Sequence, residues 1–163
     1  MKISNFRNLL KGNKLSAIFA TLILFAIVLG CGGGKPETPS ESEAQYLVKA
    51  TISDFADAVD KGDFSGFRTK ASSDFQSQFS NDQMNTAFKA FIDAKAQAVP
   101  VLRKASTMDA KFSSAPSIRE EKGNYVLVTA GTMDKTPAKT RFNYEYVWRD
   151  GAWKLLVVKT FLE

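Results

Sequence analysis

Few side chains in this sequence of 163 residues could do covalent or acid–base chemistry, and the most reactive is a lone thiol at Cys31. The sequence contains no histidine, so the commonest general base and the commonest transition-metal ligand are both missing. The phenols of Tyr144 and Tyr146 could stabilise an oxyanion, as an isomerase requires. That chemistry also needs a carboxylate beside them, and Glu145 alternates onto the opposite face of the strand. We therefore expect no catalytic residue.

Three carboxylates at a spacing of three, Asp57, Asp60 and Asp63, could bind a cation. Such a series is more often the solvated face of a helix, and no segment matches a calcium-binding loop. The glycines from Gly32 to Gly34 do not form a phosphate loop, because no strand precedes them and no Lys-Ser/Thr pair follows. We expect neither a metal nor a cofactor.

The thiol of Cys31 lies directly after an apolar segment, Leu15–Leu29, which a basic opening precedes. This segment has 15 residues, whereas a helix that spans a bilayer needs about 20. The pattern is typical of a secretory signal. The tetrapeptide Val28-Leu29-Gly30-Cys31 resembles the bacterial lipobox, which implies a signal peptide over residues 1–30 and a lipid on Cys31. The alternatives are an ordinary signal peptide or an uncleaved anchor with an incidental cysteine.

The resemblance to lipoproteins also implies a location. Gly32 follows the cysteine, which by the known sorting pattern implies the outer membrane in a Gram-negative cell. In a Gram-positive cell the anchor would lie in the outer face of the plasma membrane. Residues 1–31 carry four basic and no acidic side chains, so the net charge of +5 falls to +1 after processing. The basic character is therefore confined to the signal, and we expect no nucleic-acid partner.

We expect the processed chain to have two parts. Residues 31–42 hold the lipidated cysteine and a tract rich in Gly, Pro, Ser and Glu, which is typical of a flexible tether. Residues 43–163 are long enough for one domain with a single core.

The first half of this domain is predicted to be helical. The first helix has a capping box at Ser40 with Glu43 or at Ser42 with Gln45, and it ends at Gly62. Its buried stripe is predicted to hold Val48, Ile52, Phe55 and Val59. A short helix is expected over Ser73–Phe79. A longer one is expected from the capping box at Ser80 and Gln83 to Pro100, with Met84, Phe88, Phe91 and Ile92 on one face.

The second half is predicted to form strands, because the apolar period changes to two. The expected strands are Met108–Ser113 with a continuation at Ser117–Glu120, Asn124–Met133, Thr140–Trp148 and Trp153–Phe161, with a break at Pro137. Asp150-Gly151 is the pair favoured in a two-residue type I′ hairpin. That turn predicts pairs on one face, Trp148–Trp153, Tyr146–Leu155, Tyr144–Val157 and Phe142–Lys159. On the other face it predicts Val147–Lys154, Glu145–Leu156, Asn143–Val158 and Arg141–Thr160. The fold class is then α+β, with N-terminal helices packed on a curved antiparallel sheet.

Two segments, Ala58–Phe64 at the end of the first helix and Val147–Leu155 in the closing hairpin, resemble the nuclear transport factor 2-like superfamily, which includes ketosteroid-isomerase-like proteins. The resemblance implies a cone-like sheet with a cavity at its wide end. The predicted cavity lining is Phe55, Phe88, Phe91, Phe142, Tyr144 and Tyr146. The alternative interpretation of the same residues is plain core packing. Proteins of this superfamily often dimerise through the sheet, so the resemblance makes the mixed face with Asn143, Glu145, Leu156 and Val158 a candidate contact for a second copy or a protein partner.

Two functions follow as hypotheses. The first is a lipid-anchored, non-catalytic module of the cell envelope that binds a small apolar ligand or a protein partner. The second is an envelope enzyme of the isomerase, dehydratase or cyclase type that uses the cone cavity.

Overall fold

The computed structural model describes residues 35–134 and 138–163. Cys31, the predicted signal peptide, residues 31–34 of the predicted tether and Pro137 lie outside the described residues. Lys35–Glu163 forms a compact unit of its own.

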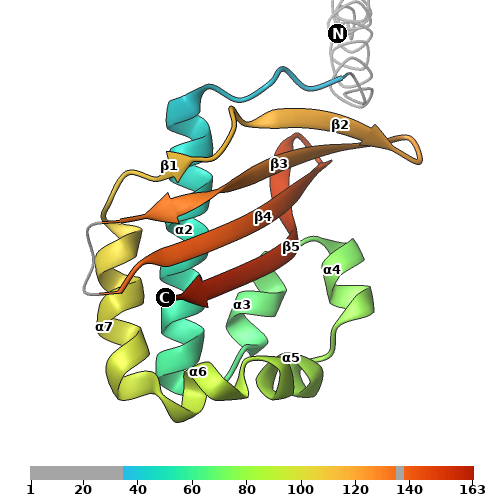
Figure 1. Ribbon diagram of the computed structural model, residues 1–163. Coiled ribbons are helices and arrows are strands. Elements are labelled where there is room, and N and C mark those ends of the chain that lie inside the picture. Colours follow the sequence, from blue (N-terminus) through green and yellow to red (C-terminus); the bar gives the residue numbers. More distant parts are fainter. Residues whose placement is uncertain (1–34, 135–137) are drawn as a thin grey trace, which may run out of the picture. The chain divides into compact units, whose positions relative to one another are not determined.

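The predicted α+β class and antiparallel sheet are confirmed. The described helices are α2 (Glu41–Lys61), α3 (Ser65–Lys70), α4 (Ser73–Gln78), α5 (Asn81–Ala87), α6 (Lys89–Asp93) and α7 (Lys95–Ser106). The strands are β1 (Lys111–Phe112), β2 (Ser117–Glu121), β3 (Asn124–Met133), β4 (Thr140–Arg149) and β5 (Ala152–Leu162). Both β1 and β2 pair with β3, and β4 and β5 follow in order, so β5 is one edge strand and β1 and β2 form the opposite edge. Figure 1 shows α2 crossing behind the sheet, with α5 and α6 near the C-terminal end of α2.

Helix α2 begins where its capping residues dictate. Ser40 and Glu43 form the reciprocal capping box, and Gly62 ends the helix in the left-handed conformation at φ 68°. Side chains four and three residues apart then face the sheet, and Val48, Ile52 and Phe55 are fully buried. The predicted stripe is confirmed. The first helical residue, Glu41, lies two residues before the predicted domain boundary at 43.

The single helix predicted from Ser80 to Pro100 is wrong. The chain forms three helices that break at Phe88 and Ala94, where ψ is 16° and 20°. Neither break is at a glycine or proline, so no local signal marks it. Pro100 lies inside α7 and does not end it. Proline removes one helical hydrogen bond. The helix continues beyond it because side chains of the following turn, such as Leu102, are fully buried in the core.

The closing hairpin has the predicted turn, with Asp150 at φ 52° and Gly151 at φ 76°. The predicted pairing holds as far as Tyr146–Leu155, after which a β-bulge shifts the register. The predicted pairs beyond this point, Tyr144–Val157, Phe142–Lys159, Glu145–Leu156, Asn143–Val158 and Arg141–Thr160, are wrong. The pairs found are Tyr144–Val158, Phe142–Thr160, Glu145–Val157, Asn143–Lys159 and Arg141–Phe161.

The extra residue of the bulge is Leu156 in β5. Insertion of one residue exchanges the faces of all that follow. Val158 therefore packs against the core opposite Tyr144, not on the mixed outer face where the sequence predicts it. The predicted strand Met108–Ser113 also shrinks, because only Lys111 and Phe112 pair with β3.

Candidate functional site

The six residues of the predicted cavity lining divide into a buried group and a group that reaches cavities. Phe55, Phe142, Tyr144 and Tyr146 lie in the core with at most 2% of their surface exposed. Phe55 is the hub of the phenylalanine cluster, with ring centroids of Phe64, Phe67, Phe88 and Phe91 between 4.9 and 6.0 Å away, all edge to face. Phe88 and Phe91 are only partly buried, and each lines a cavity at the edge of the sheet.

The two core phenols are each satisfied by a threonine. The Tyr144 hydroxyl lies 2.8 Å from Thr160 Oγ1, and the Tyr146 hydroxyl lies 2.9 Å from Thr51 Oγ1. Thr51 donates its one proton to the Leu47 carbonyl at 2.9 Å, so Tyr146 is the donor in the second pair. Burial raises the pKa of both tyrosines.

These pairs lack the partner that enolate chemistry needs. Within residues 35–134 and 138–163, no hydrogen bond joins a carboxylate to the hydroxyl of Tyr144 or Tyr146. Glu145, between them in sequence, accepts from Arg119 at 2.7 Å on the other face of the sheet. The two phenols therefore act as buried, hydrogen-bonded parts of the core.

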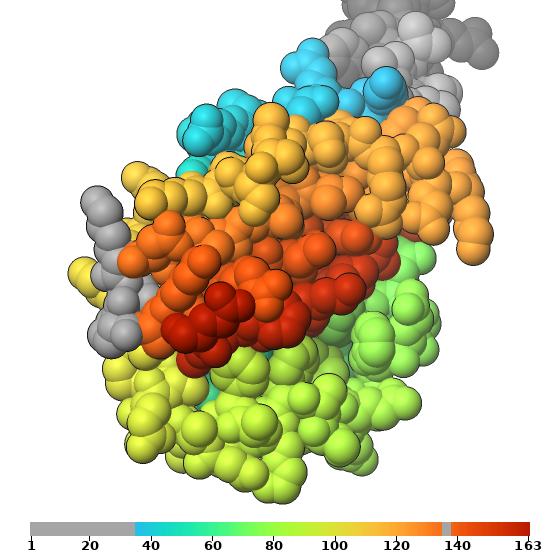
Figure 2. Space-filling view, viewed as in Figure 1, coloured from blue at the N-terminus to red at the C-terminus, as the bar shows by residue number. Residues whose placement is uncertain are grey.

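An apolar cavity of about 360 Å³ lies beside the free edge of β5. We call it the β5 groove. The residues that border it are the apolar Phe75, Phe79, Met84, Ala87, Phe88, Leu156, Val157 and Val158 and the polar Gln78, Gln83 and Lys159. At one end of this space the Ser72 amide, just before α4, donates to the Leu155 carbonyl of β5 at 2.9 Å. Figure 2 shows β5, in dark red, above the green and lime segments that carry α4–α6.

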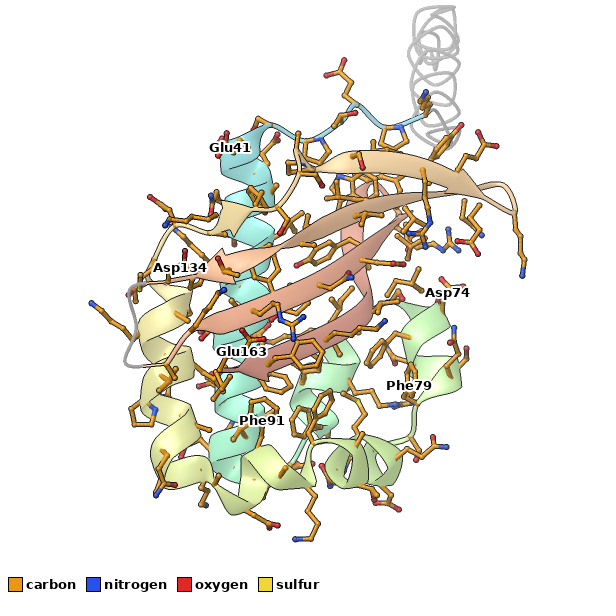
Figure 3. The ribbon with its side chains drawn as sticks, in the orientation of Figure 1. Glu41, Asp74, Phe79, Phe91, Asp134 and Glu163 are labelled. Atoms are coloured by element: carbon orange, nitrogen blue, oxygen red, sulfur yellow. The ribbon has the colours of Figure 1, made fainter. Side chains whose placement is uncertain are left out.

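The same edge continues toward the C-terminus. A second cavity, of about 330 Å³, is lined there by residues that include Phe91, Phe161 and Leu162. Figure 3 places Phe91 below the C-terminal end of β5 and Phe79 farther along, on the side of α4. Lys139 and Glu163 exchange two hydrogen bonds, which fixes the alternation of bonded and non-bonded pairs along β4 and β5. Tyr144 and Val158 then form a pair without hydrogen bonds, so the backbone groups of Val158 point away from β4 toward this edge.

Of the residues that border the β5 groove, only Phe88 was predicted from the sequence to line a cavity. Leu156 and Val158 were predicted on the outer face of the sheet, whereas both border the groove. Phe75, Phe79 and Met84 were not predicted to line a cavity. The structure places Phe79 directly after α4 with 40% of its surface exposed, a property that the sequence pattern does not reveal.

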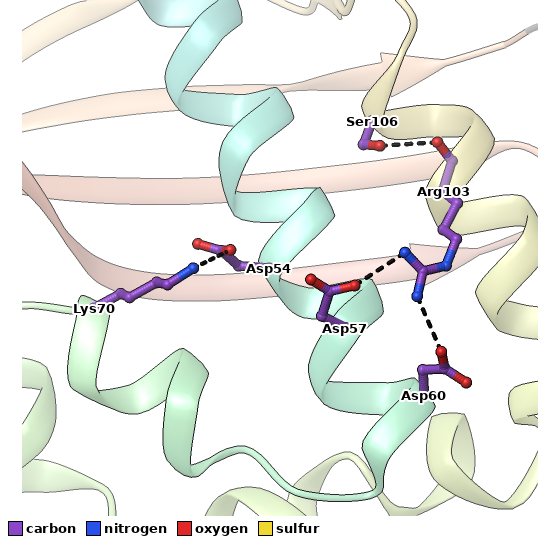
Figure 4. A network of polar contacts seen from close by, with 6 residues as sticks. All are labelled: Asp54, Asp57, Asp60, Lys70, Arg103 and Ser106. Carbon is purple, nitrogen blue, oxygen red and sulfur yellow. Dashed lines mark hydrogen bonds and ion pairs between the residues drawn. The ribbon is translucent and has the colours of Figure 1, made fainter.

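The aspartates that could have bound a cation are engaged otherwise. Asp57 and Asp60 both pair with Arg103 at 3.0 Å, as Figure 4 shows. Asp63 accepts hydrogen bonds from Ser65 and Asn81, which lower the pKa of its carboxyl group. The described residues contain no group of three side chains placed to hold a metal ion.

The outer face of the sheet keeps part of its predicted character. Glu145 is held by Arg119, and the Oδ1 atom of Asn143 is buried without a hydrogen-bond partner. Apolar Val126 and Val147 are at most 2% exposed on the same face. A second copy or a protein partner on this face stays a prediction.

In comparisons with protein-family models, curated proteins and solved structures, nothing matched this chain. Among the helices of the described residues, none combines the length and apolarity that crossing a bilayer requires.

Proposed function

We propose that this chain is a lipid-anchored protein of the cell envelope whose domain binds a small apolar ligand in the β5 groove without catalysis. The observation that carries the proposal is the groove itself, an apolar cavity of about 360 Å³ at the rim of the core. The volume lies within the range of about 300–1,000 Å³ found for small-molecule sites. The lipobox supports the anchor, and the cone of the nuclear transport factor 2-like proteins is the fold variant that the α+β arrangement favours.

The chemistry of the lining indicates the class of ligand. The walls are aromatic and aliphatic, so the body of the ligand is apolar. Lys159 borders the groove, and its exposed side chain leaves the outer face of the edge strand opposite Asn143, from where it can extend around this edge. Within the described residues it forms no ion pair. A cation beside an apolar cavity fits an amphiphile with a carboxylate at one end, such as a fatty acid.

Binding can be measured with cis-parinaric acid, a fatty acid whose fluorescence rises in apolar sites. The domain Lys35–Glu163 suffices, because it is a separate compact unit with its own core. We expect saturable binding to the wild-type domain. Replacement of Lys159 by glutamine should weaken binding of the acid and leave binding of its methyl ester unchanged.

A filling variant and a matched control identify the cavity. Ala87 is an exposed helical residue that borders the groove, so Ala87→Trp should occupy the groove and abolish binding. Ala96 is also an exposed helical alanine and does not border the groove. Ala96→Trp should bind as the wild type does. Absence of saturable binding to the wild type, or equal binding by both variants, would contradict the proposal.

The anchor has a separate test. Cys31→Ser should leave an unprocessed precursor that takes up no labelled fatty acid in a bacterial host. Normal acylation of this variant would overturn the lipoprotein assignment and leave the groove assignment untouched.

A further inference from the structure

A second aromatic surface lies at the end of the domain where α2 begins. It is a cleft of about 600 Å³ that includes Tyr46, Trp148 and Trp153, together with Glu37 and Glu43. We call it the aromatic cleft. The two indoles are a cross-strand pair with ring centroids 5.1 Å apart, and they are only partly buried. Tyr46 has 73% of its surface exposed, the largest value among the exposed large hydrophobic side chains described.

The composition of this surface suits one environment in particular. Tryptophan and tyrosine combine an apolar ring with a polar group, and they concentrate at the headgroup level of membranes. The acidic side chains at the cleft, Glu37 and Glu43, would be repelled by anionic lipids. The surface therefore fits zwitterionic headgroups.

The chain itself limits which face of the domain can reach a bilayer. Glu37 and Pro39 line the cleft, and Ser40 caps α2, so the described part of the chain begins beside this surface. The six residue steps from Cys31 to Glu37 span at most about 20 Å. The far end of α2, which has 21 residues, lies about 30 Å from its start. A lipid on Cys31 would therefore bring the start of α2 within reach of the membrane, and α5 and α6 lie near the opposite end of α2 (Figure 1).

We propose that the aromatic cleft contacts the zwitterionic headgroup layer of the membrane that holds the anchor, and so orients the domain with the β5 groove away from the bilayer. This inference rests on the lipid anchor of the proposed function. The cleft contact adds a second point of attachment besides the acyl chains. Attachment at two points restricts the orientation of the domain on the membrane.

The chain supplies its own reporter, because its only two tryptophans are the pair in the cleft. The full-length lipidated protein is reconstituted into phosphatidylcholine vesicles, with and without bromine on the acyl chains. We expect tryptophan emission to shift to shorter wavelength on the vesicles and to be quenched by the brominated lipid. Exchange of phosphatidylcholine for phosphatidylglycerol should reduce the quenching.

Two variants separate contact from anchoring. Tyr46→Ser changes an exposed side chain of the cleft, and Phe79→Ser changes an exposed aromatic residue of the β5 groove. We expect Tyr46→Ser to lose quenching while the protein still floats with the vesicles, and Phe79→Ser to keep it.

Flotation without quenching of the wild type would overturn the cleft contact alone. A wild-type protein that does not float would overturn the anchor and this inference together, whereas parinaric acid binding would still report on the groove. An emission change with soluble glycan fragments and none with lipid would also overturn the contact, in favour of a carbohydrate site.

Discussion

The aromatic row on the inner face of β4 is closed at one end and open at the other. Phe142, Tyr144 and Tyr146 are sealed in the core, whereas Trp148 lies at the aromatic cleft. All four side chains are aromatic, so the difference in their burial comes from the part of the helical layer that lies opposite each of them. Thr51, in the middle of α2, binds Tyr146, but α2 has only just begun where Trp148 lies. Both proposed binding surfaces occur where the helices cease to cover the sheet.

The largest expected difference in stability is between alanine variants of two phenylalanines. Phe55→Ala removes the hub of the core cluster and should cost about 3–5 kcal/mol of unfolding free energy, because a cavity remains. Phe79→Ala removes a side chain that is 40% exposed and should cost less than about 1 kcal/mol. Urea unfolding of the two variants measures both values. Similar losses would mean that the β5 groove is as tightly packed as the core.

Alkaline pH provides the second test, because the sealed phenols have raised pKa values. The folded state then holds these two protons more tightly than the unfolded state does. The stabilisation is complete below the ordinary tyrosine pKa near 10 and is lost as the pH rises above it toward the raised values. Each phenol should contribute a slope of about 1.4 kcal/mol per pH unit there.

The measurement is chemical unfolding at a series of alkaline pH values. The double variant Tyr144→Phe, Tyr146→Phe should lose stability less steeply above pH 10 than the wild type does, because both buried phenols are gone. Parallel profiles for the two proteins would show that these phenols reach solvent.

The elements that the sequence predicts well are those with local signals. Ser40 with Glu43 and the left-handed Gly62 bound α2, and Asp150-Gly151 sets the hairpin. Each depends on residues within a few positions of one another, so spacing alone is sufficient.

What the sequence does not predict depends on distant contacts. The bulge at Leu156 lies in a run of aliphatic residues that pair equally well in either register, so nothing local marks the shift. The helix breaks at Phe88 and Ala94 likewise lack glycine or proline. Leu156 of the bulge and Phe88 of the first helix break both border the β5 groove. The inner row of β4 was predictable as an aromatic face, but whether it is open depends on what α2 places against it.

The third test removes a tyrosine hydroxyl group once in the core and once at the aromatic cleft. Tyr146→Phe removes the proton that Thr51 accepts in the core, and should cost about 0.5–1.5 kcal/mol. Tyr46→Phe removes the same hydroxyl from an exposed ring at the aromatic cleft, so the free energy of unfolding should not change measurably. The pair can be compared by thermal unfolding at neutral pH. A loss in the second variant equal to that in the first would contradict the openness of the cleft.

The smallest effect should come from a polar contact at the solvent-exposed surface. Arg103 bridges Asp57 and Asp60 from α7 to α2, and all three side chains are about half exposed. Ion pairs in water gain little and are screened by salt. Arg103→Gln should therefore shift the melting temperature less than Tyr146→Phe does, and added sodium chloride should remove the shift. The Tyr146→Phe loss should persist in salt, because a neutral hydrogen bond out of solvent is not screened. A salt-independent loss in Arg103→Gln would instead place this bridge among the contacts that hold α7 to α2.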